Sequence, residues 1–228
     1  MNADEHKIIG KASPRSDGPE KTTGKGKYVV DIALPDMLWC KVLRSPYPHA
    51  KILSIDTSAA EALPGVHAVI TGEDFKGKRW GKLIQDEPII AWDRVMYIGD
   101  KVAAVAAEDE DIAENALNLI EIEYEELPSV FTIEESVESD APILHPDFNE
   151  YEGVAEKLDG PTNIVVNGHW EKGDVVSGMN QADHVIEKTF FTGRTHQLYL
   201  EPHNCVVAID EDKNCLLYTS DAADERSS

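Results

Sequence analysis

The hydrophobic positions of the chain recur in short runs that alternate with polar residues or end at prolines. In residues 120–125, Ile120, Ile122 and Tyr124 alternate with glutamates, and this period of two is typical of a half-buried strand. Similar runs, rich in β-branched residues and bounded by turn residues, cover 28–32, 38–43, 52–55, 66–70 and 101–106. The pattern therefore predicts several short strands separated by proline turns.

Two short helices are predicted between these strands. Residues 56–58 supply N-cap side chains ahead of the alanine-rich stretch 59–63, and a Pro-Gly pair ends that stretch. The acidic run 108–111 precedes a helical stretch at 112–119, where its negative charge suits the positive end of the helix dipole. Each helix is flanked by strands, so we expect an α+β fold built from two strand–helix–strand units.

Composition divides the chain into an arm, two regions and a linker. Residues 1–26 mix charge with glycine, proline and serine and are predicted to form a surface arm. Residues 27–133 contain both strand–helix–strand units, with a long excursion at 72–94. The acidic, aperiodic stretch 134–160 is predicted as a linker, and 161–214 as the start of a second domain. Strand-like runs in that second region lie at 164–166, 184–191 and 198–209.

Charge and cysteine content exclude several classes of protein. The formal net charge of -22 would repel nucleic acid and anionic membrane surfaces, so neither is an expected partner. Cys40, Cys205 and Cys215 fit neither a zinc motif nor a four-cysteine iron–sulfur motif, so any iron–sulfur centre is expected on another chain. Because the sequence shows no apolar leader at its start, we expect a cytoplasmic protein.

Many ordered blocks of the sequence resemble one enzyme family. They include LRSPYPHA at 43–50, GDKVAAVA at 99–106 and IEYEELP at 122–128. Further blocks lie at 15–24, 34–38, 169–174 and 195–203. Over nearly all of 9–210, the chain resembles the molybdenum-cofactor-binding large subunit of the xanthine dehydrogenase/aldehyde oxidase family. The resemblance implies an α/β-hammerhead domain at 27–133 and the start of a molybdopterin-binding domain at 161–214.

The resemblance also implies a function. Members hydroxylate a heteroaromatic or aldehyde-type carbon with oxygen derived from water. A molybdopterin cofactor, here expected in the cytosine dinucleotide form, carries out the redox chemistry, and electrons pass to 2Fe-2S and FAD centres. Those centres are expected on a small and a medium partner subunit, in a dimer of heterotrimers. The sequence does not identify the substrate.

No catalytic residue is assigned within this sequence. The family's catalytic glutamate and its Gly-rich cofactor segment would lie beyond residue 228, so the isolated chain is expected to be inactive. The alternative function is a non-catalytic, hammerhead-type binding or structural module, which a native stop codon after Asp210 would favour.

Within the chain, the resemblance implies cofactor contacts at Thr195, His196 and Gln197. A side-chain amide can hydrogen-bond an oxygen of the molybdenum centre, which makes Gln197 the first candidate, although an ungapped alignment places Thr195 at that position. Glu201 is interpreted as structural. His196, His203 and Cys205 offer nitrogen and sulfur, but no fourth ligand follows, so no metal site is predicted.

The last residues, 215–228, do not resemble the family. Read in one frame, the DNA of a transposase sequencing adapter encodes CLLYTSDAADE, which is the sequence from Cys215 to Glu225. We therefore expect this tail to be non-native and leave it out of the functional interpretation.

Overall fold

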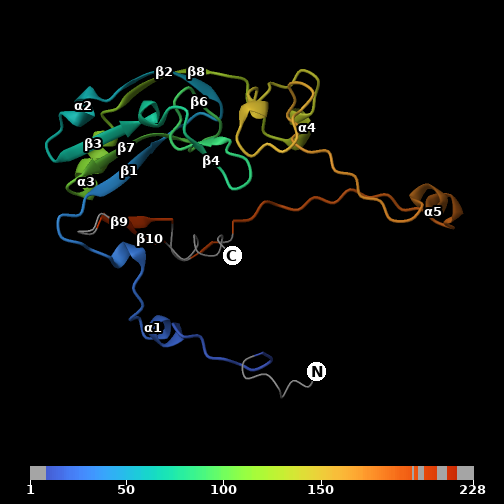
Figure 1. Cartoon of the computed structure of the whole chain (residues 1–228), viewed down its shortest axis with the longest axis horizontal. Helices are drawn as coiled ribbons and strands as arrows, with labels where there is room; N and C mark the ends of the chain where they lie inside the picture. Colours follow the sequence, from blue (N-terminus) through green and yellow to red (C-terminus); the bar gives the residue numbers. More distant parts are fainter. Residues whose placement is uncertain (1–8, 197, 200–202, 210–214, 220–228) are drawn as a thin grey trace. The chain divides into compact units, whose positions relative to one another are not determined.

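The computed structural model describes residues 9–196, 198–199, 203–209 and 215–219 of the chain. It divides into two compact units (Figure 1). The larger unit is Asp36–Ile186, and the smaller one joins Met1–Pro35 to Glu187–Ser228. The larger unit mixes short strands with short helices, which is the α+β arrangement that the sequence predicts.

The first sheet of the larger unit has β7 at its centre. β7 (Lys101–Ala107) pairs antiparallel with β1 (Trp39–Arg44) along one edge and with β3 (Val66–Thr71) along the other. Five of the seven residues of β7 are buried, as a strand covered on both faces requires. The strands predicted at 38–43, 66–70 and 101–106 are confirmed.

Alanines let two helices approach this sheet closely. α3 (Glu110–Leu117) packs against β1 and β7 and buries Ala113 and Ala116, while α2 (Ser58–Glu61) buries Ala60. The N-cap of α3 is Asp109, whose side chain accepts a hydrogen bond of 2.7 Å from the Ile112 N–H. Both predicted helices are therefore present, and an acidic residue caps the longer one as expected.

The second sheet places β2 (Ala50–Asp56) between β6 (Arg94–Val95) and β8 (Glu121–Glu126). Ala50 and Val95 join Val102 of β7 in one core cluster, and Ile122 packs against the cores of both sheets. The register of β2 shifts near Leu53, whose side chain stays exposed. β8 is the alternating strand that the sequence predicts at 120–125.

The excursion and the acidic stretch that follows the sheets pack against each other. The excursion contains η3 (Gly72–Phe75), β4 (Arg79–Trp80) and β5 (Glu87–Pro88), and the acidic stretch contains α4 (Ile133–Ser136) and η4 (Phe148–Glu150). Gln85 N–H donates to the Glu152 carbonyl at 2.8 Å. Asn149 exchanges two hydrogen bonds with the Leu158 backbone, and Asn163 bonds three backbone groups of 136–144. The region predicted as a linker therefore has an ordered path.

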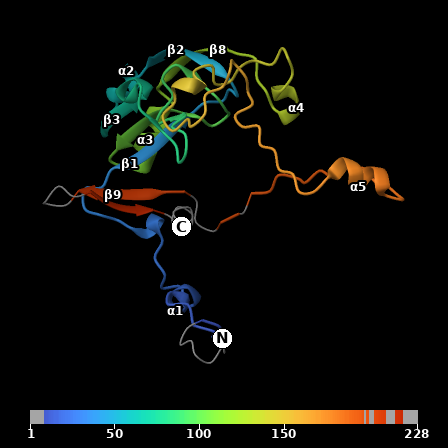
Figure 2. The same cartoon turned by 45° about the vertical axis from the view of Figure 1, so that its right-hand side comes forward.

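The second region exposes most of its apolar side chains. α5 (Val175–Gln181), capped by Asp174, follows an extended segment (Figures 1 and 2). The strands predicted at 164–166 and 184–191 are wrong for this structure, since no strand of the described chain lies beside them to supply ladder hydrogen bonds. The large exposed side chains between 164 and 191 are Ile164, Val165, Val166, Trp170, Val175, Val176, Met179, Val185, Ile186, Phe190 and Phe191.

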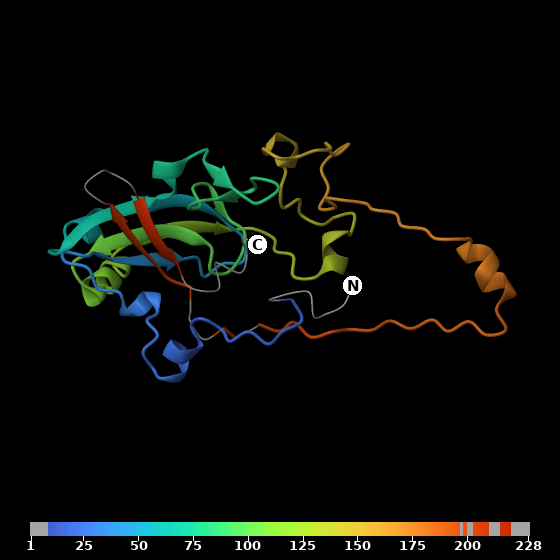
Figure 3. The ribbon, with the colours of Figure 1, turned by 60° about the horizontal axis from the view of Figure 1, so that its bottom comes forward.

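The smaller unit contains α1 (Gly18–Thr22), η2 (Val29–Asp31), β9 (Cys205–Ile209) and β10 (Cys215–Thr219). β9 and β10 pair antiparallel and form the two orange-red strands in Figure 3. A strand predicted at 28–32 is wrong, because the Asp31 carboxylate accepts from the Tyr28 N–H at 2.9 Å and closes a 3-10 turn. The predicted non-native tail includes β10, and its origin stays a prediction.

None of the helices in the described part of the chain combines the length and the apolar character needed to cross a bilayer.

Replacing Gly72 by alanine will destabilise the larger unit. An added Cβ would lie 2.1 Å from the Ala91 carbonyl oxygen, so two backbone segments must separate, and such overpacking costs about 1–3 kcal/mol. Chemical denaturation should show this loss for Gly72→Ala. Gly160→Ala, whose Cβ meets no atom within 4 Å, should change the stability by less than about 0.5 kcal/mol. Equal stability of the two variants would contradict this packing.

Candidate functional site

The predicted cofactor-contacting segment carries three neighbouring aromatic rings. The Tyr199 ring lies 5.1 Å from the His196 ring and 4.9 Å from the His203 ring, measured between centroids, and both pairs are tilted. Leu198 between them adopts φ 53°, a left-handed conformation that turns the chain sharply. The turn gathers the three rings over a short stretch of sequence.

This turn also fixes the tautomer of His196. The Leu198 N–H donates a 3.0 Å hydrogen bond to His196 Nδ1, so Nδ1 is an acceptor and a neutral imidazole carries its proton on Nε2. The ring is exposed, and Nε2–H is therefore a donor directed away from the backbone. Such a donor can bind an oxygen of a ligand.

The predicted trio is only partly described. Thr195 and His196 are adjacent and exposed, whereas Gln197, and with it Glu201, lies outside the described residues. A hydroxyl, two imidazoles and a phenol are groups that can hydrogen-bond a ligand.

Within the described ranges, no group of three or more His, Cys, Asp or Glu side chains is arranged to hold a metal ion. His203 and Cys205, which the sequence places two residues apart, are both exposed.

In the first domain, the polar residues of the sequence motifs are buried and do not form an exposed functional site. Ser45, His49 and Asp100 are its buried polar side chains among the described residues. Asp100 accepts hydrogen bonds from the Met96 and Lys101 N–H groups at 3.1 and 2.9 Å, and its carbonyl accepts one from the Ser45 N–H. Burial raises the pKa of the Asp100 carboxyl despite these donors. These groups hold the turn that leads into β7.

His49 ties β2 to the end of β8. Its Nδ1–H donates to the Pro128 carbonyl at 2.7 Å, while Nε2 is buried and has no hydrogen-bond partner within the described structure. The Leu127 N–H donates to the His49 carbonyl at 3.0 Å. His49 therefore has a structural role.

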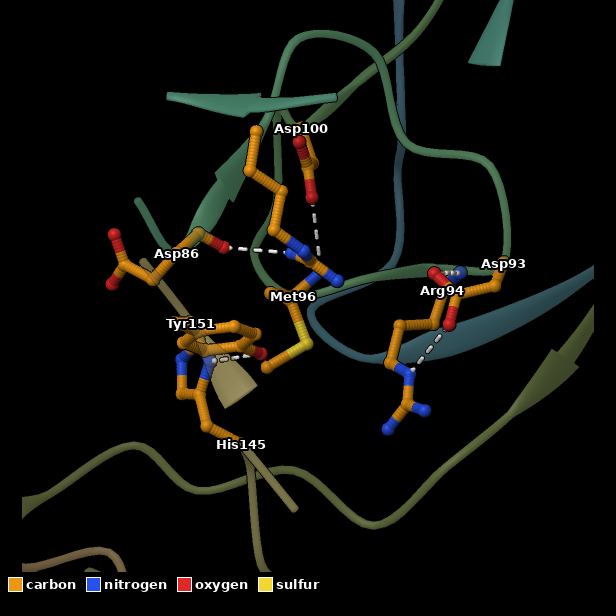
Figure 4. A network of polar contacts seen from close by, with 8 residues as sticks. Asp86, Asp93, Arg94, Met96, Asp100, His145 and Tyr151 are labelled. Atoms are coloured by element: carbon orange, nitrogen blue, oxygen red, sulfur yellow. Dashed lines mark hydrogen bonds and ion pairs between the residues drawn. The ribbon is translucent and has the colours of Figure 1, made fainter. Parts of the chain in front are cut away.

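A second polar cluster joins the excursion to the acidic stretch (Figure 4). The Arg79 guanidinium lies 4.8 Å from the ring centroids of both Trp92 and Tyr151. It also donates to the Asp86 carbonyl at 2.8 Å. His145 Nδ1 lies 3.2 Å from the Tyr151 hydroxyl, and the two rings meet edge to face. The sequence did not reveal this cluster, since its members come from two segments that were interpreted separately.

Beside this cluster is an open polar cavity of about 300 Å³. Its lining consists of Gly77, Arg79, Gln85, Asp147, Glu150, Tyr151 and Glu152. The only cation in this lining is already held between two rings, and the carboxylates do not converge as a metal site. The cavity therefore carries no assigned chemistry.

Comparison with known proteins identifies both regions of the chain. Residues 23–128 match the family described as "Aldehyde oxidase and xanthine dehydrogenase, a/b hammerhead domain", and residues 156–225 match the "Molybdopterin cofactor-binding domain". The chain belongs to the xanthine dehydrogenase/aldehyde oxidase family. Residues 36–128 of the hammerhead match lie in the larger unit, and the start of a molybdopterin-binding domain follows along the chain. The resemblance inferred from the sequence motifs is confirmed.

The curated relatives are much longer than this chain. A probable xanthine dehydrogenase subunit of Bacillus subtilis is 41% identical over 92% of the chain, which spans 27% of that protein. The nicotinate dehydrogenase large molybdopterin subunit of Eubacterium barkeri is 39% identical over 91% of the chain, which spans 46% of it. The chain therefore spans about a quarter to a half of these relatives.

Solved structures show the same fold. Quinoline 2-oxidoreductase from Pseudomonas putida matches 92% of the chain with a TM-score of 0.76 and 30% identity, and the chain covers 26% of it. Aldehyde oxidoreductase from Desulfovibrio desulfuricans matches 96% of the chain with a TM-score of 0.78 and 28% identity, and 24% of it is covered. The α+β hammerhead prediction agrees with both.

Acidification will loosen the packing of residues 144–152 on the hammerhead domain. Burial lowers the pKa of His145; the charge of Asp86 opposes this, and those of Arg79 and Arg94 add to it. The net effect is a lowered pKa, so the unfolded form binds its proton more readily. Stability is therefore retained above the ordinary value of 6.5 and lost as the pH falls below it.

Hydrogen–deuterium exchange, corrected for intrinsic rates, should measure faster opening of these residues at about pH 5 than at about pH 7. His145→Phe keeps an aromatic ring beside Tyr151 and has no titrating group, so its opening should not depend on pH in this range. Identical pH profiles for the variant and the parent chain would disprove the role of His145.

Proposed function

We propose that this chain forms the hammerhead domain and the beginning of the cofactor domain of a molybdenum hydroxylase large subunit. The whole subunit would hydroxylate a heteroaromatic or aldehyde-type carbon with oxygen derived from water. One observation carries the proposal: a closed hammerhead core is followed in the same chain by a molybdopterin-domain segment whose apolar side chains are exposed. Such a segment needs further polypeptide to complete its core.

The cofactor of this subunit would be molybdopterin, in the cytosine dinucleotide form. When bound, it supplies the two-electron redox chemistry at the substrate carbon. Thr195, His196 and Gln197 would hold it, with the His196 Nε2–H as a donor whose direction the Leu198 N–H fixes. These residues would orient the group and would not exchange protons with the substrate.

The electron acceptors would be separate 2Fe-2S and FAD subunits, in a dimer of heterotrimers. The three cysteines of this chain lack iron–sulfur spacing, and relatives are named as a subunit or a large chain, among them the carbon monoxide dehydrogenase large chain of Hydrogenophaga pseudoflava. A cytoplasmic location stays a prediction.

Extension of the gene beyond the codon for Asn214 will distinguish an enzyme subunit from a binding module. The longer subunit, produced in a host that makes molybdopterin, should retain molybdenum after gel filtration, while the 228-residue chain should retain none and show no hydroxylase activity. We expect no molybdenum on the 228-residue chain because residues 164–191 expose their apolar side chains, and such an open domain cannot enclose a cofactor. Hydroxylase activity of the isolated chain, or a reading frame that ends without a cofactor segment, would refute the proposal.

Within the longer subunit, Gln197→Ala should lower cofactor occupancy or activity by about 10- to 100-fold, the range seen when a group that orients a metal centre is removed. Gln181→Ala is the matched control, because Gln181 is exposed on α5 and bonds only Ser177 of its own helix among the described residues. Molybdenum content per subunit should be measured alongside activity. Equal molybdenum content and activity in the two variants would remove Gln197 from the cofactor site.

A further inference from the structure

The sequence contains a single Asn-Gly pair, Asn167–Gly168, which lies in the extended segment before α5. Both residues are exposed. Their neighbours are exposed as well, since Val166 is 79% and Trp170 is 99% accessible to solvent. Water therefore reaches the side chain of Asn167 and the backbone of Gly168 without any movement of the chain.

No hydrogen bond restrains this pair within the part of the chain that the structure describes. Neither the Asn167 side-chain amide nor the Gly168 N–H has a hydrogen-bond partner there. A Cβ added at Gly168 would meet no atom within 4 Å, so no neighbouring group packs against the backbone at this point. Rotation of the backbone at the pair therefore breaks no contact of the described structure.

The other asparagines of the sequence lack this combination of features, because none of them precedes a glycine. Asn163 makes three hydrogen bonds with backbone groups, and Asn149 makes two. Asn118 donates to a backbone carbonyl of α3 at 3.1 Å. Asn180 is exposed like Asn167, but Gln181 follows it and both belong to α5. Asn180 is therefore an internal control for the effect of exposure alone.

We propose that Asn167 is a site of spontaneous deamidation. The Gly168 backbone nitrogen gives up its proton to a base in the solvent and attacks Asn167 Cγ, so that a new C–N bond closes a succinimide ring. The bond from Cγ to the side-chain nitrogen breaks, and that nitrogen takes up a proton and leaves as ammonia. Water then adds to one of the two ring carbonyls and gives aspartate or isoaspartate. Water is the only co-reactant, nothing is oxidised or reduced, and the reaction does not depend on the proposed function.

Glycine at position 168 is the reason why this asparagine reacts faster than the others. Ring closure brings the Gly168 nitrogen onto Asn167 Cγ, and a residue without Cβ neither crowds this approach nor restricts the backbone angles that it needs. Asparagine is a chemically labile residue, and folded structure protects it only where it restrains the backbone or the amide. The described structure provides no such restraint at this pair.

Both products change the charge and geometry of the segment. Each product replaces a neutral amide by a carboxylate, which adds one negative charge to a chain whose formal net charge is -22. Isoaspartate also routes the main chain through the former side chain and lengthens it by one methylene. Residues 164–166, directly before the site, have the sequence pattern of a strand, and the longer backbone puts the following residues out of the alternation that strand pairing requires. Modification therefore opposes any strand that continues past residue 167.

Peptide mapping by mass spectrometry tests this site on the 228-residue chain, incubated in neutral buffer at physiological temperature. Deamidation at Asn167 should be at least about tenfold faster than at Asn180, a difference of roughly 1.4 kcal/mol in activation free energy. Isoaspartate should be among the products, because only the succinimide route forms it. A smaller ratio, or aspartate without isoaspartate, overturns the proposal.

Two glycine variants make the test specific. Gly168→Ala should slow deamidation at Asn167 by about tenfold or more, because the added methyl group crowds the attacking nitrogen. Gly178→Ala is the matched control: its Cβ also meets no atom within 4 Å, and the reaction at Asn167 should keep its rate. Circular dichroism shows whether both variants fold like the parent chain. An unchanged rate in Gly168→Ala would exclude attack by this nitrogen.

Unfolding in urea measures what the native structure contributes. Because no contact restrains the pair, the rate at Asn167 in the folded chain should lie within about twofold of the rate in the unfolded chain. A folded-chain rate below that range would show that the segment is restrained and would contradict the structural basis of the proposal.

Discussion

The small side chains of β7 are the constraint on which the hammerhead domain depends. Ala103, Ala104 and Ala107 are buried in a strand that is paired on both edges, and α3 meets this sheet with its own buried alanines. Short side chains at such contacts let the helix and the sheet approach closely, and each added methylene would separate the layers. This short distance between helix and sheet sets the positions of β1 and β3 and of the turns that carry Ser45 and Asp100. The centre of the domain is therefore closely packed.

Local signals made most of this core predictable. Periodicity located β7 and β8, and the acidic run located the start of α3, since each depends on residues close in sequence. The strand predicted at 28–32 failed because the side chain of Asp31 competes for a backbone N–H, which a hydrophobic pattern does not register. The strands predicted at 164–166 and 184–191 failed for a different reason. Their pattern is that of strands, but the described structure offers no neighbouring strand to pair with them.

The candidate site was less predictable than the fold. Family motifs drew attention to Ser45, His49 and Asp100, and the structure gives them backbone-holding roles in a buried setting. The Arg79 cluster depends on a tertiary contact between two segments without periodicity, so no sequence pattern pointed to it. The sequence did single out the segment around His196, and the left-handed turn at Leu198 supplies a geometric detail, the tautomer, that residue identity does not determine.

The order of the chain has a consequence for its synthesis. Every buried apolar residue of the described structure lies between Val29 and Phe148, while the exposed apolar side chains of the second region come later. A nascent chain emerges N-terminus first, and domains generally fold as units during translation. The hammerhead core can therefore close while the ribosome is still adding the cofactor domain. The exposed apolar side chains of residues 164–191 would then emerge after that core has closed, and until they are covered they are the part of the described chain most prone to aggregate.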